Sequence, residues 1–312
     1  MQKLVMMVMI GFLASCSGEK TMDQKLNQVD QIFAAYDSPD MPGAAVMIIE
    51  NGTPILQKGY GMAHFDTNSP VTAKSNFRLA SVTKQFTAMS ILQLIEKGEL
   101  SFDTSLKDVF EEFPEYGRTL TMEHLLQHTS GIADYGPMGT MDLGRQFKDQ
   151  DVLDFTLTLD AADFLAGDKH EYSNTAYVVL TKVLEKVTGQ TFREYLKENI
   201  FDPAGMDNTK AFEDGVNIVN DRVYGYTIEE EGVRETDQNK WSALLGDGGI
   251  YSNLEDLYKW DQILYTDKLM GQKFMDMAVT NHKTNDGKPM DYGYGWRIEN
   301  YKGMDIEYHT GS

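Results

Sequence analysis

The sequence predicts an α/β protein of the α+β type, in which an antiparallel sheet is flanked by helices and joined to a largely helical region. Three observations support this class: strand-like runs near both ends of the chain, helical patterns over about residues 100–245, and a serine-bearing helix with an apolar stripe after the first strands. The chain has 312 residues, of which 41% are hydrophobic, and this is enough for a sizeable core.

The N-terminus has the pattern of an exported lipoprotein. Lys3 precedes an uncharged run over 4–13, which is too short to span a bilayer and is typical of a signal peptide. The Leu-Ala-Ser-Cys sequence that ends at Cys16 resembles a bacterial lipobox. We therefore expect a signal peptide over 1–15, lipid on Cys16 and a polar tether over 16–24. A plain signal peptide with an incidental cysteine is the alternative.

The same segment predicts that the protein is located in the bacterial cell envelope. Ser17, rather than aspartate, comes after Cys16, which in the lipoproteins of Gram-negative bacteria that it resembles favours the outer membrane. We therefore expect a membrane contact through the lipid anchor. Cys16 is the only cysteine, so the mature chain would have neither disulfides nor metal thiolates. The net charge of −20 argues against nucleic acid as a partner.

A helix and a hairpin are expected at the start of the folded domain, which we place over 25–312. Apolar residues recur at helical spacing over 25–36, and the run from Ala44 to Ile49 indicates a buried strand. Asn51-Gly52 is a strong turn signal for a two-residue hairpin, and residues 53–65 supply the returning strand.

The serine-bearing helix comes next. Its apolar stripe consists of Val82, Phe86, Met89, Leu92 and Ile95, and Gly98 follows where a left-handed C-cap is expected. We therefore expect a buried helix with Ser81 in its first turn.

Ser81 and Lys84 lie three residues apart, so they share one face of that helix. A serine hydroxyl needs a base to become a good nucleophile, and a lysine can serve once burial lowers its pKa. The free N–H groups of a helix N-terminus can stabilise an oxyanion. Ser-x-x-Lys alone is a weak signal, because Ser17 and Lys20 repeat it in the polar tether. An ordinary helix start with a snorkelling lysine is the alternative.

Shorter helices are expected through the helical region, followed by a hairpin. Residues 120–127 and 176–187 have helical patterns, and Thr191 and Ser252 each open a capping-box sequence. Residues 292–299 and 304–309 read as two strands of a hairpin near the end of the chain. These strands could join the first hairpin in one sheet.

Two further constellations could carry chemistry. Tyr172-Ser173-Asn174 precedes a helix and offers a proton-relay group and an amide, whereas its repeat Tyr251-Ser252-Asn253 places Ser252 as a structural N-cap. His309-Thr310-Gly311 ends a strand, and its glycine would let a ligand approach the backbone.

Two histidines look like functional residues but favour structural interpretations. His128-Thr129-Ser130-Gly131 is similar to the His309 stretch but reads better as a helix C-terminus with a glycine cap. His124 and His128 have the spacing of a metal pair, but no glutamate lies as in His-Glu-x-x-His, so a core or capping role is favoured.

With Ser81-x-x-Lys84, Tyr172-x-Asn174 and His309-Thr310-Gly311 in this order, the chain resembles the penicillin-recognising serine hydrolases over roughly residues 25–312. This family includes class C β-lactamases, D-alanyl-D-alanine carboxypeptidases, D-aminopeptidases and esterases. The resemblance implies a β-lactamase/transpeptidase-like fold with the site between the sheet and the helical region.

The resemblance also implies roles for individual residues. Ser81 would be the nucleophile, Lys84 and Tyr172 the acid/base groups, and Asn174 a contact to the substrate amide. His309, Thr310 and Gly311 would line the substrate on the edge strand. The backbone N–H groups of Ser81 and Ser312 would form the oxyanion hole. No cofactor and no metal are implied.

Two features depart from the family pattern. β-Lactamases of this kind have lysine where His309 stands, whereas some carboxypeptidases and D-peptidases have histidine, so the resemblance favours a peptidase. The family continues with another strand and a helix after the position of Ser312, so we expect this sequence to be a C-terminally truncated fragment.

We therefore expect a serine hydrolase that works through an acyl-enzyme on D-Ala-D-Ala-type peptides. A carboxylesterase or a weak β-lactamase is the alternative among enzymes, so an ester or a β-lactam could replace the peptide. A non-catalytic envelope binding protein with the same fold is the alternative of another class.

Overall fold

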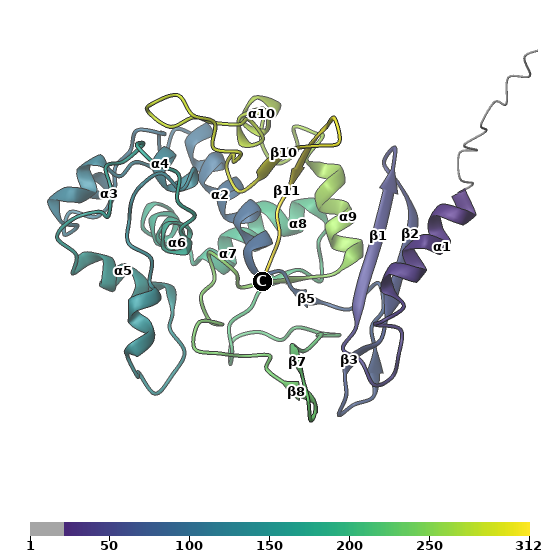
Figure 1. Cartoon of the computed structure of the whole chain (residues 1–312). Coiled ribbons are helices and arrows are strands. Elements are labelled where there is room, and N and C mark those ends of the chain that lie inside the picture. Colours follow the sequence, from purple (N-terminus) through teal and green to yellow (C-terminus); the bar gives the residue numbers. More distant parts are fainter. Residues whose placement is uncertain (1–21) are drawn as a thin grey trace, which may run out of the picture.

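A computed structural model describes residues 22–312 (Figure 1). The expected signal peptide, Cys16 and the tether as far as residue 21 lie outside the described residues. Residues 22–24, which we expected in the tether, belong to the first helix, α1 (Met22–Phe33). Within the described part of the chain, no helix combines the length and the apolar character that crossing a bilayer requires.

The N-terminal part forms the predicted helix and hairpin beside the helical body (Figure 1). Strands β1 (Ala44–Glu50) and β2 (Thr53–Tyr60) pair in antiparallel fashion around Asn51-Gly52, whose φ angles of 52° and 74° match the predicted turn. The returning strand does not continue to residue 65. It breaks at Gly61, where φ is +64°, and resumes as β3 (Met62–His64), which pairs with β4 (Ser69–Pro70).

The helix after Ser81 forms the centre of the molecule. Strand β5 (Phe77–Arg78) leads into a 3₁₀ turn, η1 (Ala80–Thr83), and then into α2 (Lys84–Glu96). Ser81 therefore lies in the 3₁₀ turn and not in the α-helix. Every residue of α2 as far as Leu94 is buried, so the helix is enclosed on all sides rather than along one stripe. Gly98, with φ of +74°, follows the end of α2 as predicted.

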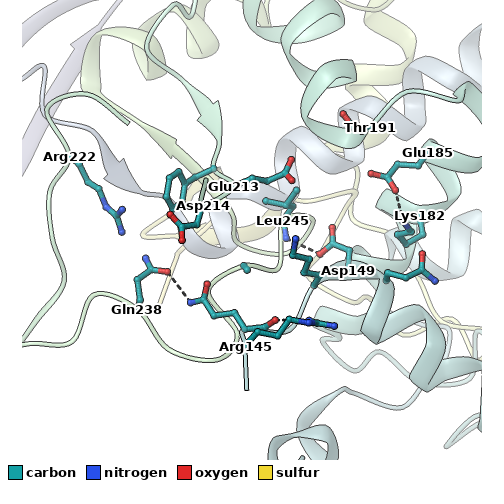
Figure 2. A pocket seen from close by; sticks show the side chains of 15 residues that line it. Arg145, Asp149, Lys182, Glu185, Thr191, Glu213, Asp214, Arg222, Gln238 and Leu245 are labelled. Atoms are coloured by element: carbon teal, nitrogen blue, oxygen red, sulfur yellow. Dashed lines mark hydrogen bonds and ion pairs between the residues drawn. The ribbon is translucent and has the colours of Figure 1, made fainter. Parts of the chain in front are cut away.

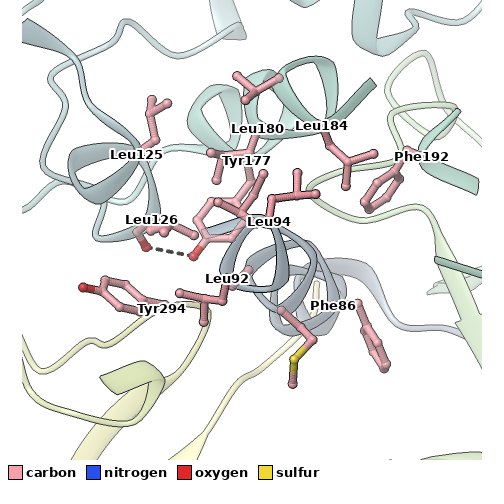
Figure 3. Close-up of a cluster of buried hydrophobic side chains, with 14 of the residues drawn as sticks. Phe86, Leu92, Leu94, Leu125, Leu126, Tyr177, Leu180, Leu184, Phe192 and Tyr294 are labelled. Atoms are coloured by element: carbon pink, nitrogen blue, oxygen red, sulfur yellow. Dashed lines mark hydrogen bonds between the residues drawn. The ribbon is translucent and has the colours of Figure 1, made fainter. Parts of the chain in front are cut away.

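The main hydrophobic core surrounds α2 (Figure 3). Phe86, Leu92 and Leu94 of α2 pack with Leu180 and Leu184 of α6 (Asn174–Thr188), and all five side chains are at most 1% exposed. Helix α6 begins after the N-cap Ser173, two residues before the predicted start, and is followed by the left-handed Gly189. Truncating a core aromatic such as Phe86 to alanine costs about 3–5 kcal/mol, so this packing holds the start of α2 rigidly.

Short elements fill the helical region around α2 and α6. They are α3 (Leu106–Val109), η2 (Glu115–Thr119), α4 (Met122–Leu126), η3 (Gly136–Thr140), α5 (Asp149–Leu157), α7 (Phe192–Leu196), the π-helical η4 (Lys197–Phe201), α8 (Asp202–Ala204), α9 (Leu254–Ile263) and α10 (Gln272–Ala278). The capping box at Thr191 is confirmed. At α9, however, the N-cap is Asn253, whose side chain accepts a hydrogen bond from the Asp256 N–H, and not Ser252.

Small antiparallel sheets make up the β structure of residues 22–312. Strand β9 (Ile250–Ser252) pairs with both β5 and β6 (Lys210–Ala211), and β7 (Tyr226–Glu229) pairs with β8 (Gly232–Glu235). The last hairpin consists of β10 (Arg297–Tyr301) and β11 (Met304–Tyr308), so its first strand begins five residues later than predicted.

The two terminal hairpins form separate two-stranded sheets, so the expectation that they join in one sheet is wrong for the described residues. The two strands of each hairpin are hydrogen-bonded to each other, and neither of these ladders connects one hairpin to the other. The end of the chain nevertheless lies beside the start of α2 (Figure 1). A Cβ added to Gly311 would meet the Leu79 carbonyl oxygen at 2.2 Å, so the last residues pack directly against the segment before Ser81.

Candidate active site

The backbone before Ser81 makes a sharp turn. The Leu79 N–H donates to the Ile250 carbonyl at 2.8 Å, which ties this segment to β9. Ala80 then has φ of +46°, a left-handed conformation that is uncommon for a residue with a Cβ. Such strain persists where the surrounding structure enforces it, as at reactive sites. The turn brings Ser81 to the N-terminal end of the buried helix α2.

Lys84 is completely buried and has three oxygen neighbours. Its Nζ lies 3.3 Å from the Ser81 Oγ, 2.8 Å from the Asn174 Oδ1 and 3.0 Å from the Asp247 carbonyl oxygen. Burial lowers the pKa of Lys84 from 10.5 to about 8, although the charges of Asp247 and Asp134 oppose this shift. A substantial fraction of Lys84 is therefore neutral near pH 7–8.

These contacts also orient the neutral amine. A neutral amine has two N–H groups and one lone pair. The Asn174 Oδ1 and the Asp247 carbonyl oxygen can only accept, so they take the two N–H groups. The lone pair is left for the Ser81 hydroxyl, which can donate. The arrangement can thus remove a proton from Ser81.

Tyr172 lies on the other side of the amine. Its ring centroid is 4.8 Å from the Lys84 Nζ, and its buried hydroxyl makes no hydrogen bond that meets ordinary geometric limits. Burial raises the pKa of Tyr172 to about 12, while the neighbouring Ser81 hydroxyl opposes that shift. Tyr172 is therefore a neutral phenol at pH 7, able to donate a proton.

Asn174 is held by its place at the first turn of α6. Its N–H donates to the Asp134 Oδ2 at 3.1 Å, and its side-chain oxygen accepts from Lys84. Burial raises the pKa of Asp134, and the Asn174 N–H opposes that shift. The side-chain amide NH₂ of Asn174 makes no such contact to Lys84 and is the group that can donate to a substrate carbonyl.

His309 lies near Tyr172, at a ring-centroid distance of 6.0 Å. Its Nδ1 is 2.7 Å from the Thr310 carbonyl oxygen, which can only accept, so Nδ1 carries the proton and Nε2 accepts from the Tyr292 hydroxyl at 3.0 Å. Burial lowers the pKa of His309 to about 4, and the charges of Lys84 and Arg297 contribute to this shift. His309 is therefore neutral at pH 7.

The structure thus brings together Ser81, Lys84, Tyr172, Asn174 and the His309-Thr310-Gly311 stretch. Gly311 contacts the Leu79–Ala80 segment, which places Ser312 one residue from that contact, while the role of the Ser312 N–H stays a prediction. The repeat Tyr251-Ser252-Asn253 lies elsewhere: the Tyr251 hydroxyl accepts hydrogen bonds from Arg222 and Gln238, and Ser252 bonds with Thr209.

Sequence reasoning missed three residues of this region. Arg297 of β10 lies with its guanidinium carbon 5.5 Å from the Tyr172 ring centroid, and its charge lowers the pKa of both Lys84 and His309. Asp247 contributes a backbone carbonyl and a carboxylate that accepts from the Tyr135 hydroxyl at 2.7 Å. Glycines surround Asp247 in the sequence, which is a weak signal; Arg297 has no local signal.

His128 is the third: its predicted place as a buried residue at the end of a helix is confirmed, since it follows α4, but its contact with Tyr172 was missed. It has φ of +59°, its Nδ1 accepts from the Ser173 N–H at 3.0 Å, and its ring lies 4.4 Å from that of Tyr172. Burial lowers the pKa of His128, so a neutral ring supports the turn that carries Tyr172. His124 instead bonds with Thr121 in the capping box of α4. Among residues 22–312, no group of three or more His, Cys, Asp and Glu side chains could hold a metal ion.

The chain is similar to several known proteins. The chain is 29% identical over 292 residues to penicillin-binding protein 4* of Bacillus subtilis (strain 168), which covers 88% of this chain and 64% of the relative. It is 28% identical over 285 residues to a D-aminopeptidase of Gluconobacter oxydans (strain 621H), and this alignment covers 87% of this chain and 51% of the relative. The chain therefore spans about half to two thirds of these relatives.

A similar solved structure is that of the octameric penicillin-binding protein homologue from Pyrococcus abyssi. The TM-score is 0.78 at 28% sequence identity, with 94% of this chain and 68% of that chain covered. The Beta-lactamase family model matches residues 29–312. The chain belongs to the Beta-lactamase family.

Proposed function

We propose that this protein is a D-alanyl-D-alanine carboxypeptidase-like peptidase that works through an acyl-enzyme on Ser81. The observation that carries the proposal is the buried Lys84 amine, which has two hydrogen-bond acceptors and leaves its lone pair for the Ser81 hydroxyl. A binding protein without catalysis would have no use for a lysine that is costly to bury and partly neutral near physiological pH.

In the first half of the reaction, Lys84 and Tyr172 act one after the other. Neutral Lys84 accepts the Ser81 proton as Oγ bonds to the scissile carbonyl carbon. The oxyanion that forms is stabilised by backbone N–H groups at the start of α2. Tyr172, a neutral phenol, donates a proton to the leaving amine as the C–N bond breaks, and Lys84 returns a proton to Tyr172. The products are the ester on Ser81 and the free D-amino acid.

The second half releases the acyl group. A water molecule takes the place of the departed amine and gives a proton to the same base while its oxygen bonds to the acyl carbon. The ester bond to Ser81 breaks, and Oγ recovers a proton. Asn174 holds the substrate amide through its NH₂ group during both steps, while its oxygen keeps Lys84 in place.

The charge of Arg297 supports a substrate with a free carboxylate. Arg297 is a cation at neutral pH, whereas His309, which was expected to line the substrate, is neutral there. Arg297 lies beside the ring of Tyr172, the group proposed to give its proton to the leaving amine. A C-terminal D-alanine would place its carboxylate toward this cation.

A D-aminopeptidase is a second candidate, favoured by the carboxylates of Asp134 and Asp247. Both charges raise the pKa of Lys84, so both lie close enough to the site to attract a substrate ammonium group. The D-aminopeptidase relative gives this candidate further support. The two candidates differ in the charge that the substrate must carry.

Two substrates separate the candidates. An N-acetylated D-Ala-D-Ala peptide has a carboxylate and no amine, whereas D-alanine p-nitroanilide has an amine and no carboxylate. We expect hydrolysis of the first, and Arg297→Gln should lower its kcat/KM by about tenfold or more, as for loss of a charged hydrogen bond. Hydrolysis of the anilide alone, unaffected by Arg297→Gln, would contradict the carboxypeptidase proposal and favour the aminopeptidase.

We also propose that the protein is a lipoprotein of the bacterial cell envelope, at the outer membrane. The support is the Leu-Ala-Ser-Cys sequence that ends at Cys16 after an uncharged run. Metabolic labelling with palmitate should mark the wild type and not Cys16→Ala. An unlabelled wild-type protein would contradict the proposal.

A further inference from the structure

A cavity of about 710 Å³ lies away from Ser81 and contains a buried carboxylate (Figure 2). Asp149, the first residue of α5, is 9% exposed and lies on the wall of this cavity. Its Oδ1 accepts from the Leu245 N–H at 2.9 Å, and its Oδ2 lies 2.9 Å from the Thr181 hydroxyl oxygen of α6. Asp149 thus joins three separate parts of the chain.

The segment 245–248 connects Asp149 to the candidate active site. Its Asp247 carbonyl accepts from Lys84, and its Gly246 carbonyl accepts from the Thr87 hydroxyl at 2.7 Å, so it follows the buried face of α2. On its other side, a Cβ on Gly246 would meet the Thr181 Cγ2 at 2.3 Å. The segment is therefore held tightly between α2 and α6, and the N–H of its first residue, Leu245, donates a hydrogen bond to Asp149.

The Thr181 hydroxyl has one proton and two neighbours that accept. It lies 2.7 Å from the Val178 carbonyl oxygen as well as 2.9 Å from the Asp149 Oδ2. When Asp149 is ionised, Thr181 must donate to it. When Asp149 is protonated by solvent, Asp149 donates to the Thr181 oxygen, and Thr181 donates to Val178. Both arrangements satisfy every group, so the contact is compatible with two protonation states.

We propose that Asp149 is a positioning residue whose ionised form holds the segment 245–248, and with it the Asp247 carbonyl, against Lys84, so that protonation of Asp149 slows acylation of Ser81. The proposal rests on the proposed function of Ser81 and Lys84. A charged acceptor binds the Leu245 N–H more strongly than a neutral one. Loss of that charge loosens the segment that supplies one of the two acceptors to Lys84.

The surroundings of Asp149 bring its titration into the physiological range. Burial raises its pKa to about 7, and the charges of Asp247 and Glu185 add to the shift, whereas the N–H of Leu245 and the hydroxyl of Thr181 oppose it. Other charged groups also face the cavity. These are Arg145 and Lys148 before α5, Lys182 on α6, and Glu213, Asp214 and Arg222 on the opposite wall. The cavity gives protons access to the carboxylate.

The test compares wild type and Asp149→Asn in the rate of Ser81 labelling by a fluorophosphonate, across pH. Asparagine imitates the protonated form, since it accepts from Leu245 and donates to Thr181. We expect equal rates below about pH 6 and a wild type about tenfold faster above about pH 8, the difference between a charged and a neutral acceptor. The main charges that shift the pKa of Lys84 are those of Asp247, Asp134 and Arg297, and Asp149→Asn removes none of them, so the ratio of the two rates reports mainly on Asp149.

Further variants keep the test decisive if Asp149→Asn does not fold. Thr181→Val retains the methyl group against Gly246 but removes a donor to the carboxylate, so the acid limb of labelling should move to higher pH. Thr181→Ser should restore the wild-type limb, and Gln150→Ala, on the same cavity wall, should leave it unchanged.

The two possible failures give different results. A wild-type protein that is labelled no faster than Ser81→Ala would contradict the proposed function itself. Labelling at Ser81 with a wild-type to Asp149→Asn ratio that is the same at every pH would leave that function standing and overturn the role of Asp149. A limb that Thr181→Val does not move would overturn it as well.

Discussion

The lowered pKa of Lys84 predicts how acylation of Ser81 depends on pH. Burial lowers this pKa from 10.5 to about 8. At pH 7 a lysine with a pKa of about 8 is neutral in about 10% of molecules, against about 0.03% for an unperturbed lysine, so burial raises the reactive fraction by about 300-fold. Labelling by an uncharged fluorophosphonate should therefore rise with pH as Lys84 loses its proton, reach half its maximum near pH 8 and level off above about pH 9.

Substitutions that remove single charges around Lys84 should change its pKa. The Asp247 carboxylate raises the pKa of Lys84, and so does Asp134, whereas Arg297 lowers it. Asp247→Asn keeps an acceptor for the Tyr135 hydroxyl and does not alter the backbone carbonyl that meets Lys84. Removing the negative charge disfavours the protonated amine, so the inflection should move to lower pH. Arg297→Gln removes a positive charge and should move it to higher pH.

The assay is the second-order rate constant of labelling, measured on gels from about pH 5.5 to pH 10, a range that contains the whole inflection. Asp134→Asn serves as a second removal of negative charge, expected to shift the inflection in the same direction as Asp247→Asn. The reasoning would be refuted if Asp247→Asn and Arg297→Gln moved the inflection in the same direction. It would also be refuted if wild-type labelling slowed steadily as pH rises.

Three further predictions follow from the site. Ser81→Ala should lower hydrolysis by several orders of magnitude while substrate binding persists, measured as kcat and as Kd for a substrate; labelling that survives this change would contradict the assignment. Tyr172→Phe should lower kcat by about a hundredfold or more, as for a lost proton donor, and Tyr251→Phe should be mild; the reverse order would show that the other tyrosine acts. Asp149 keeps its proton in the folded state up to about pH 7 but loses it near pH 3.8 when the chain is unfolded, so the stability of the protein falls as pH rises between these values. Asp149→Asn should therefore stabilise the protein by up to about 4 kcal/mol at pH 8 and by little at pH 4. Urea unfolding at the two pH values measures this difference.

Elements with local chemical signals were predicted well from the sequence. Asn51-Gly52 required a hairpin, because both residues tolerate positive φ. Helix α6 was expected from its apolar pattern, and the structure adds the N-cap Ser173 and the left-handed Gly189, which satisfy backbone groups at its two ends. The N-cap of α9 was misassigned to Ser252, since Ser252 and Asn253 are both good caps and only the bond to Thr209 decides between them.

The candidate site likewise contains some residues that the sequence could reveal and one that it could not. Ser81, Lys84, Tyr172 and Asn174 could be selected because their side chains carry the chemistry and their spacing is visible. Asp247 could not, because it meets Lys84 through a backbone carbonyl, a group that every residue has. Its position depends on how segment 245–248 packs between two helices, which is a property of the assembled core.

His309 shows why the charge of a site cannot be read from residue type. A histidine stands in place of the family's lysine, and an ordinary histidine, with a pKa of about 6.5, would titrate near neutral pH. In the structure, burial and the charges of Lys84 and Arg297 lower the pKa of His309 to about 4, so protonating it near pH 7 would place a third positive charge in one buried region. The same neighbour that keeps His309 neutral, Arg297, is itself a permanent cation beside Tyr172. In the proposed mechanism, the pH dependence near neutrality therefore comes from Lys84 and Asp149, while attraction for a carboxylate comes from Arg297, a residue on β10 that no motif contains.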